Sequence, residues 1–283
     1  MLKKRKISMV LLIVLSLMLV SAGCGTAPNS ATSSSAGTQA PRSDALSPAA
    51  TESVELTISA AASMTDALKE IQTAYEKQHP NIKLNFNFGA SGALQQQIEQ
   101  GAPADLFLSA AAKNMKALVD KQLIDANQQK HVLSNELVAV VAADGKASIA
   151  GAADLSKPDV KNIAIGIPES VPAGTYAKEA LTNTKLWDSL QSKMVQGKDV
   201  RQVLQYVETA NADVGFVYKT DALTSQQVKV AFTVDSTTYT PVQYPIGIVK
   251  ATKHSKEAEG FYSYLQSKEA LDIFVKYGFS VLK

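Results

Sequence analysis

Hydrophobic and polar residues alternate in several short segments of the chain, and each segment is followed by a helical pattern. Leu56 and Ile58 alternate with polar neighbours, and residues 64–78 then carry apolar side chains three to four positions apart. Residues 82–88 alternate again and lead into a glycine-containing turn and another helical stretch. A period of two is typical of a strand, and a period near 3.6 is typical of a helix. The order strand, helix, strand predicts an α/β fold with a largely parallel sheet and helices on both faces.

The same alternation continues to the end of the chain. Further strands are predicted at 105–109, 136–142, from 163, at 214–218, at 228–232 and in the extended stretch 240–250. Further helices are predicted at 112–121, 173–182, 200–208, 255–266 and 268–276. A chain of 283 residues is long enough for two modest units. We expect two lobes: residues 54–135 with 243–283 form the first, and residues 136–242 form the second.

The N-terminal pattern differs from the rest. Four cationic residues at 3–6 precede an apolar run at 7–20 and the small residues 21–23, which is the layout of a secretory signal peptide. The apolar run is too short for a comfortable membrane span. Cys24 is the only cysteine, and its position resembles the lipobox of bacterial lipoproteins, although Ser21 replaces the usual leucine. The pattern predicts a lipoprotein signal peptide at 1–23 and lipidation of Cys24; an unmodified signal peptide cut nearby is the alternative.

Residues 24–53 form a linker of distinct composition. They are mostly serine, threonine, alanine, proline and glycine, with almost no large apolar side chain. Such a segment cannot bury enough surface to offset the entropy of ordering it. We expect a disordered tether that holds an anchored extracytoplasmic domain away from the outer face of the cell membrane.

The composition excludes one class of partner. Apolar residues at 46% and charged residues at 19% are ordinary for a globular protein. Removal of residues 1–23 takes away four of the 28 cationic residues and none of the 26 acidic ones, so the net charge becomes 24 − 26 = −2. A basic surface for nucleic acid is therefore not expected.

Candidate binding residues occur where a strand or glycine-rich loop meets the start of a helix. Ser63, Ser91, Ala173 and Val200 occupy such places, two in each predicted lobe. Helix N-termini point unpaired N–H groups and a positive dipole end at whatever lies in front of them. A cleft closed by both lobes would surround one small anion with hydrogen-bond donors. Each position also has an ordinary interpretation, since both serines and the residue before Val200 are common helix caps.

The chain as a whole resembles the molybdate-binding proteins of bacterial ABC importers from about residue 54 to its end. The segments that carry the resemblance are 60–67 (AAASMTDA), 101–110 (GAPADLFLSA), 171–181 (VPAGTYAKEAL), 199–201 (DVR) and 277–279 (YGF). The resemblance implies a type II periplasmic-binding-protein fold with the ligand cleft between two lobes. It also implies that an ABC permease and its ATPase are partners. We expect a monomer that captures molybdate, and tungstate as well, and delivers it to the permease.

The resemblance also assigns roles in the site. It implies that Ser63 and Ser91 supply hydroxyls, that Ala173 and Val200 supply backbone amides, and that Tyr218 supplies a phenolic hydroxyl. The metal is then held as an oxyanion, with no direct bond from protein to metal and no cofactor. Members of the family often carry consecutive serines in the second loop, where this chain has Ser91 alone.

The proposed set of donors fits a doubly charged anion. A charge-assisted hydrogen bond from N–H or O–H contributes about 1.5–3 kcal/mol, so no cationic side chain is required. A site of donors alone disfavours monohydrogen phosphate, whose proton needs an acceptor. Separation of molybdate from sulfate would then depend on cavity size.

Two other functions remain open. A protein of the same fold could bind sulfate, phosphate or another small acid; a carboxylate ligand would call for an arginine, and Arg201 is interpreted as a charge on a helix surface. A serine hydrolase is remote, because the loop Gly89-Ala-Ser91-Gly92 has Ala93 where a nucleophile elbow has glycine. The three histidines lie in no catalytic motif and are interpreted as solvated surface residues. We therefore expect a binding protein and no enzyme.

Overall fold

Two β-sheets organise the part of the chain that the computed structural model describes, residues 53–145 and 148–282. The predicted signal peptide, most of the tether and the predicted lipidation site Cys24 lie outside the described residues. The first sheet has the strand order β11-β4-β10-β3-β1-β2. Its strands are β1 (Val54–Ala61), β2 (Ile82–Gly89), β3 (Leu106–Leu108), β4 (Ile124–Ser134), β10 (Gln243–Val249) and β11 (Ser280–Val281).

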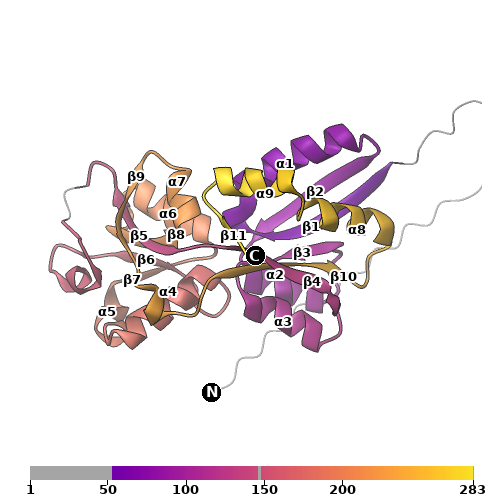
Figure 1. Ribbon diagram of the computed structural model, residues 1–283. Helices are drawn as coiled ribbons and strands as arrows, with labels where there is room; N and C mark the ends of the chain where they lie inside the picture. Colours follow the sequence, from indigo (N-terminus) through magenta and orange to yellow (C-terminus); the bar gives the residue numbers. More distant parts are fainter. Residues whose placement is uncertain (1–52, 146–147, 283) are drawn as a thin grey trace, which may run out of the picture. The chain divides into compact units, whose positions relative to one another are not determined.

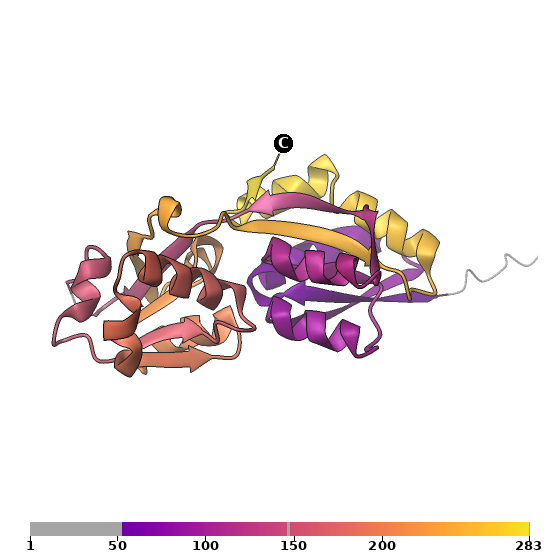
Figure 2. The same ribbon diagram turned by 90° about the horizontal axis from the view of Figure 1, so that it is seen from below.

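The second sheet has the order β7-β6-β8-β5-β9. Its strands are β5 (Leu137–Ala142), β6 (Ile163–Gly166), β7 (Met194–Gly197), β8 (Val214–Tyr218) and β9 (Val228–Thr233). We refer to the first sheet with its helices as lobe 1, and to the second sheet with its helices as lobe 2. The predicted α/β class with two lobes is confirmed (Figures 1 and 2).

Helices cover both faces of each sheet (Figure 1). In lobe 1, α1 (Thr65–Gln78), α8 (Ser255–Tyr264) and α9 (Lys268–Lys276) lie on one face, and α2 (Ser91–Glu99) and α3 (Ala112–Asp120) lie on the other. In lobe 2, α6 (Val200–Glu208) and α7 (Lys219–Leu223) lie on one face, and α4 (Pro172–Asn183) and α5 (Trp187–Leu190) lie on the other. Short 3₁₀ turns complete the list: η1 (Ala62–Met64), η2 (Ala152–Ser156), η3 (Gln191–Lys193) and η4 (Ser236–Thr238).

The expectation of largely parallel sheets is wrong, because both sheets are mixed. Strand β1 pairs in parallel with β2 and β3, whereas β10 pairs antiparallel with β3 and β4. The connectivity explains this arrangement: β4 leads the chain out of lobe 1 and β10 leads it back, so these neighbours run in opposite directions. In the second sheet, β5 and β9 add an antiparallel edge to the parallel strands β6, β7 and β8.

Strand β4 was not predicted, and its composition explains why. It contains a run of polar residues, and most of its side chains before Val132 are exposed or half-buried. No alternation of apolar residues therefore marks it. Its neighbour β10 holds it in the sheet, so tertiary pairing determines its structure.

The fold places carboxyl ends of strands and N-termini of helices at the border between the lobes. Strand β1 runs into η1, β2 runs into α2, and β8 runs into α7. The core beneath these junctions is continuous and fully buried, with Leu56, Ile58 and Phe216 among its members. Within the described ranges, no helix combines the length and apolar character that crossing a membrane requires.

Candidate functional site: a cavity between the lobes

A small cavity lies where the two lobes meet, and it leaves about 10 Å³ of room for the centre of a water-sized sphere, roughly the space of one water molecule. All five predicted binding residues line it: Ser63, Ser91, Ala173, Val200 and Tyr218. The other lining residues are small or apolar: Ala61, Ala62, Gly89, Ala90, Ala110, Val171 and Pro172. The fold thus brings together residues that are as much as 155 positions apart in the chain (218 − 63).

The two serines face the cavity from helix starts in lobe 1. Ser63 is the middle residue of η1, and Ser91 is the first residue of α2. The preceding alanines occupy the cap positions, and neither helix start has a side-chain cap. The interpretation of these serines as ordinary helix caps is therefore wrong, and both hydroxyls are available for other contacts.

Ser91 is oriented by a backbone donor. Its Oγ accepts a hydrogen bond of 2.9 Å from the N–H of Ala110, two residues after the end of β3. A hydroxyl that accepts from the protein keeps its own hydrogen for another acceptor. The fully buried Ser91 can therefore donate into the cavity.

Two backbone amides come from helix starts in lobe 2. Ala173 follows Pro172 in the first turn of α4, and Val200 is the first residue of α6. N–H groups in a first helical turn have no acceptor within their own helix. Asp199 caps α6 by accepting from the N–H of Gln202 at 2.9 Å, which leaves the Val200 amide unused by the cap. Both helices also direct the positive end of their dipole toward the cavity.

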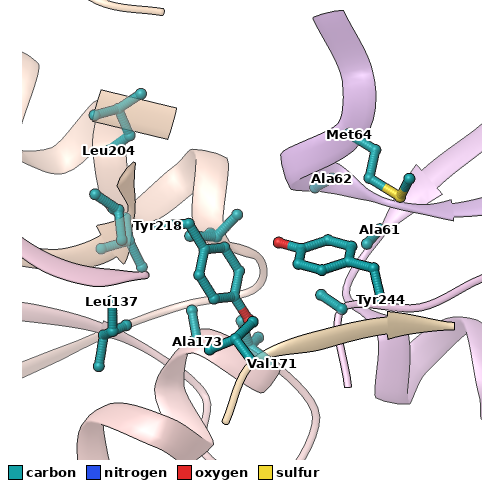
Figure 3. Close-up of a cluster of buried hydrophobic side chains, with 14 of the residues drawn as sticks. Ala61, Ala62, Met64, Leu137, Val171, Ala173, Leu204, Tyr218 and Tyr244 are labelled. Atoms are coloured by element: carbon teal, nitrogen blue, oxygen red, sulfur yellow. The ribbon is translucent and has the colours of Figure 1, made fainter. Parts of the chain in front are cut away.

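Tyr218 contributes a hydroxyl that the described residues leave without a partner. The residue ends β8, and its side chain is 1% exposed. Its Oη is buried and makes no hydrogen bond with any described residue. Burial raises the pKa of the phenol well above its usual value, so the group stays protonated and can donate. The side chain is thus fully buried at the cavity, and Figure 3 shows its ring beside Val171 and Ala173.

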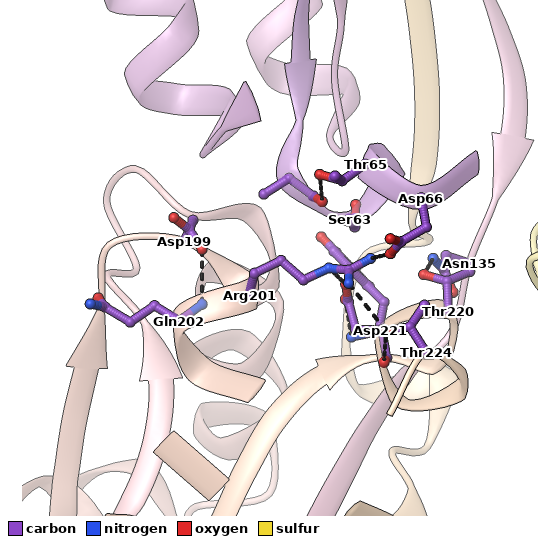
Figure 4. A network of polar contacts seen from close by, with 12 residues as sticks. Ser63, Thr65, Asp66, Asn135, Asp199, Arg201, Gln202, Thr220, Asp221 and Thr224 are labelled. Carbon is purple, nitrogen blue, oxygen red and sulfur yellow. Dashed lines mark hydrogen bonds and ion pairs between the residues drawn. The ribbon is translucent and has the colours of Figure 1, made fainter. Parts of the chain in front are cut away.

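None of the described residues that line the cavity carries a formal charge. The nearby Arg201 is engaged elsewhere: its guanidinium lies 2.7 Å from a carboxylate oxygen of Asp66 and 2.8 Å from one of Asp221 (Figure 4). Asp66 belongs to α1 in lobe 1, so Arg201 joins the two lobes instead of being a charge on a helix surface, and that interpretation is wrong. Asp221 is fully buried, and its burial raises its pKa to about 6 although Arg201 opposes the shift.

Other contacts also join the lobes around the cavity. The N–H of Gly92 donates to the carbonyl of Ser170 at 2.9 Å, and the Lys113 ammonium donates to the Thr175 hydroxyl at 3.0 Å. A Cβ added at Gly92 would lie 2.6 Å from the same carbonyl oxygen. The structure therefore has the lobes in close contact, and only a residue without a side chain fits at position 92.

Sequence reasoning missed two polar residues behind Ser63. The hydroxyl of Tyr244, in β10, lies 2.9 Å from the Ser63 hydroxyl. The side-chain amide of Asn135, between β4 and β5, donates to Tyr244 at 3.2 Å. No local pattern marks these residues, because Tyr244 lies 181 positions from Ser63 and 109 from Asn135.

Two lobes with a small cavity between them, lined by hydroxyl groups and by the N-termini of helices, are typical of a protein that binds a small solute. Among the described residues, no cluster of His, Cys, Asp and Glu could hold a metal ion directly. The chain belongs to the bacterial extracellular solute-binding proteins, because the model of that family matches residues 56–280.

Three relatives define its place within the family. The chain is 54% identical over 80% of its length to the lipoprotein YvgL of Bacillus subtilis (strain 168), and it covers 86% of that protein. YvgL is named for a proposed role as the substrate-binding protein of an ABC transporter. It is 42% identical over 81% of its length to the molybdate-binding protein ModA of Haemophilus influenzae, of which it covers 91%. A solved structure, the substrate-binding domain of a proposed molybdenum ABC transporter from Clostridium difficile, is 46% identical with a TM-score of 0.63; the match covers 82% of this chain and all of that one.

These matches bear on the sequence predictions. The predicted resemblance to bacterial molybdate-binding proteins is confirmed. The relatives are solute-binding proteins and not enzymes. Membership of a family of extracellular solute-binding proteins also supports the predicted location outside the cytoplasm.

Proposed function

We propose that this protein captures molybdate, and tungstate as well, in the cavity between its lobes and delivers it to an ABC permease and its ATPase. The observation that carries the proposal is the buried Tyr218 hydroxyl, a donor without a partner among the described residues, which faces a cavity free of formal charge. A buried donor left unpaired costs stability, so its presence points to a ligand that accepts from it. The molybdate-binding relatives supply the class of ligand.

In this proposal the five lining residues hold the oxyanion. Ser63 and Ser91 donate their hydroxyl hydrogens, Ala173 and Val200 donate backbone N–H groups, and Tyr218 donates its phenol. The metal is held through its oxygens, without a protein–metal bond. Fixed dipoles replace the hydration shell, as is general for anions at helix N-termini.

The same set of donors selects among anions. Molybdate, tungstate and sulfate carry no proton near neutral pH, whereas monohydrogen phosphate brings a hydrogen that needs an acceptor. If monohydrogen phosphate bound, its hydroxyl hydrogen would face an N–H or O–H donor of the protein and find no acceptor, which is unfavourable in a buried site. Selection between molybdate and sulfate then rests on the size of the cavity.

The proposal includes a mechanism of capture. Residues 54–135 with 243–283 act as one rigid body and residues 136–242 as the other, joined by the segments that connect β4 to β5 and β9 to β10. A ligand held by one lobe attracts the donors of the other lobe and shifts the population toward the closed form. The closed form is the one that the permease recognises.

The proposal also includes the N-terminal segment. Cleavage after residue 23 and lipidation of Cys24 would anchor the monomeric protein to the outer face of the cell membrane through the tether of residues 24–53. The lipoprotein named among its relatives supports this part of the proposal. Expression of Cys24→Ala should release the protein into the medium; a variant that stays with the membrane would contradict the anchor.

Calorimetric titration tests the ligand. The purified domain, residues 54–283, should bind molybdate and tungstate with similar affinity, and sulfate and phosphate at least about a hundredfold more weakly. Comparable affinity for sulfate would favour a protein of the same fold for another oxyanion. Absence of molybdate binding would contradict the proposal.

A further inference from the structure

Asn135 has a defined orientation, and this orientation determines where nearby hydrogens point. Its Oδ1 accepts from the N–H of Glu136 at 2.9 Å. A backbone N–H can donate a hydrogen bond but cannot accept one, so the side-chain atom of Asn135 that it contacts is the amide oxygen. The other atom is therefore the NH₂ group, which donates to Thr220 Oγ1 at 2.9 Å and to Tyr244 Oη at 3.2 Å.

The direction of the next hydrogen bond follows. Tyr244 Oη accepts from Asn135, and its own hydrogen needs an acceptor because the side chain is fully buried. Among the described residues, the hydrogen-bond partner that remains is Ser63 Oγ, at 2.9 Å. The opposite direction would leave a buried phenol hydrogen without an acceptor, which is costly. Tyr244 therefore donates to Ser63.

The hydrogen of the Ser63 hydroxyl is then available for donation to another acceptor. With Tyr244 as its donor, the Ser63 hydroxyl turns its own hydrogen toward the cavity that it lines. We propose that Asn135 and Tyr244 are positioning residues that fix the Ser63 hydroxyl as a donor, so that the cavity rejects oxyanions that carry a proton. This inference rests on the proposed function.

The same network connects the site to both lobes. Asn135 lies in the segment between β4 and β5, and its second hydrogen reaches Thr220 in α7 of lobe 2. Tyr244 lies in β10, the strand that brings the chain back to lobe 1. The relay from Asn135 through Tyr244 to Ser63 lies within lobe 1, and the hydrogen bond from Asn135 to Thr220 connects it to lobe 2.

The test compares two tetrahedral oxyanions that differ in protonation. Molybdate carries no proton near pH 7.5, whereas monomeric orthovanadate does, and both are oxyanions of a transition metal. Affinity for molybdate is measured by calorimetry, and affinity for vanadate is measured by displacement of molybdate. The ratio of the two affinities reports the preference for an aprotic ligand and is insensitive to a general weakening of the site.

Tyr244→Phe removes only the oxygen that donates to Ser63. We expect it to narrow the preference for molybdate over vanadate by about tenfold, because the Ser63 oxygen becomes free to accept a hydrogen bond from a protonated ligand. Tyr239→Phe is the matched control: its hydroxyl accepts from the Leu137 N–H at 3.2 Å and does not line the cavity, so the preference should not change. An unchanged preference in Tyr244→Phe would overturn the proposal.

Asn135→Leu tests the relay independently. Asn135→Leu should narrow the preference for molybdate over vanadate as much as Tyr244→Phe does. Because Asn135 acts through Tyr244, the variant with both substitutions should show the same preference as Tyr244→Phe alone. A further change in the double variant would overturn the relay. Thermal unfolding without ligand checks that each variant folds. Failure of the wild-type protein to bind molybdate would instead overturn the proposed function, so the two failures are distinguishable.

Discussion

Tyr218 shows at the scale of one residue how a binding site costs stability. A hydroxyl buried without a partner forfeits its hydrogen bonds to water and gains none in return. The free protein bears this cost, and a ligand that accepts the hydrogen bond removes it. The unpaired Tyr218 Oη therefore favours ligand binding and lowers the stability of the ligand-free protein.

Tyr218→Phe should separate the two effects. We expect the free energy of unfolding without ligand to stay the same or rise by about 1 kcal/mol, because an unpaired polar group is removed. Affinity for molybdate should fall by about 10–100-fold, the loss of one charge-assisted hydrogen bond. Denaturant unfolding and calorimetry measure the two quantities. Tyr262→Phe, on α8 away from the cavity, serves as the control, and undiminished affinity in Tyr218→Phe would contradict the role given to its hydroxyl.

Residues of the site could be predicted where local sequence marks them. Ser63, Ser91, Ala173 and Val200 all lie at helix starts, and helix starts have recognisable chemistry. The contacts of Arg201 could not be predicted, because its partner Asp66 is 135 positions away (201 − 66) and no pattern relates them. Roles that depend on distant partners are fixed by the tertiary fold alone.

At the scale of elements, helices and buried strands were predictable, whereas polar strands and strand directions were not. α6 begins at the residue expected because its apolar residues recur with helical period and Asp199 caps it. Strand β4 was not predicted, because its polar residues show no alternation of apolar and polar positions. The mixed direction of the sheets depends on the route of the chain between lobes, which no local pattern encodes.

The start of α7 has a titratable group that should make stability depend on pH. Asp221 accepts from the Tyr218 N–H at 3.1 Å, and burial raises its folded-state pKa to about 6, above the ordinary value of 3.8. Between these values the folded protein holds a proton that the unfolded chain releases, so the contribution of Asp221 to stability falls as the pH rises from about 4 to 6. Unfolding measured across this range should show that slope in the wild-type protein and lack it in Asp221→Asn. Identical slopes in the two proteins would contradict the assignment.

At the scale of the whole molecule, the absence of a side chain at Gly92 permits the close approach of the two lobes. A methyl group there would lie 2.6 Å from the Ser170 carbonyl oxygen of the opposite lobe. Gly92→Ala should hold the lobes apart, leave the unfolding of the ligand-free protein nearly unchanged, and weaken molybdate binding by at least about tenfold. X-ray scattering should show compaction with molybdate in the wild-type protein and less in the variant.

Gly151→Ala is the matched control for this experiment. A Cβ at Gly151 meets no atom within 4 Å, so the same chemical change should affect neither closure nor affinity. Full compaction of Gly92→Ala, with affinity like that of the wild-type protein, would contradict the role of Gly92 in the contact between lobes.

The cavity lined without a formal charge has a consequence for the medium in which the protein works. At 0.1 M salt, mobile ions largely screen attraction between full charges that are more than about 10 Å apart, but they weaken short hydrogen bonds to fixed dipoles in a buried cavity far less. Affinity for molybdate should therefore change by less than about threefold between low and high ionic strength, and titrations in rising sodium chloride measure this. A steep loss would show that long-range charge contributes to binding. A protein that captures its ligand outside the cytoplasm would thus keep its affinity while the salinity of its surroundings varies.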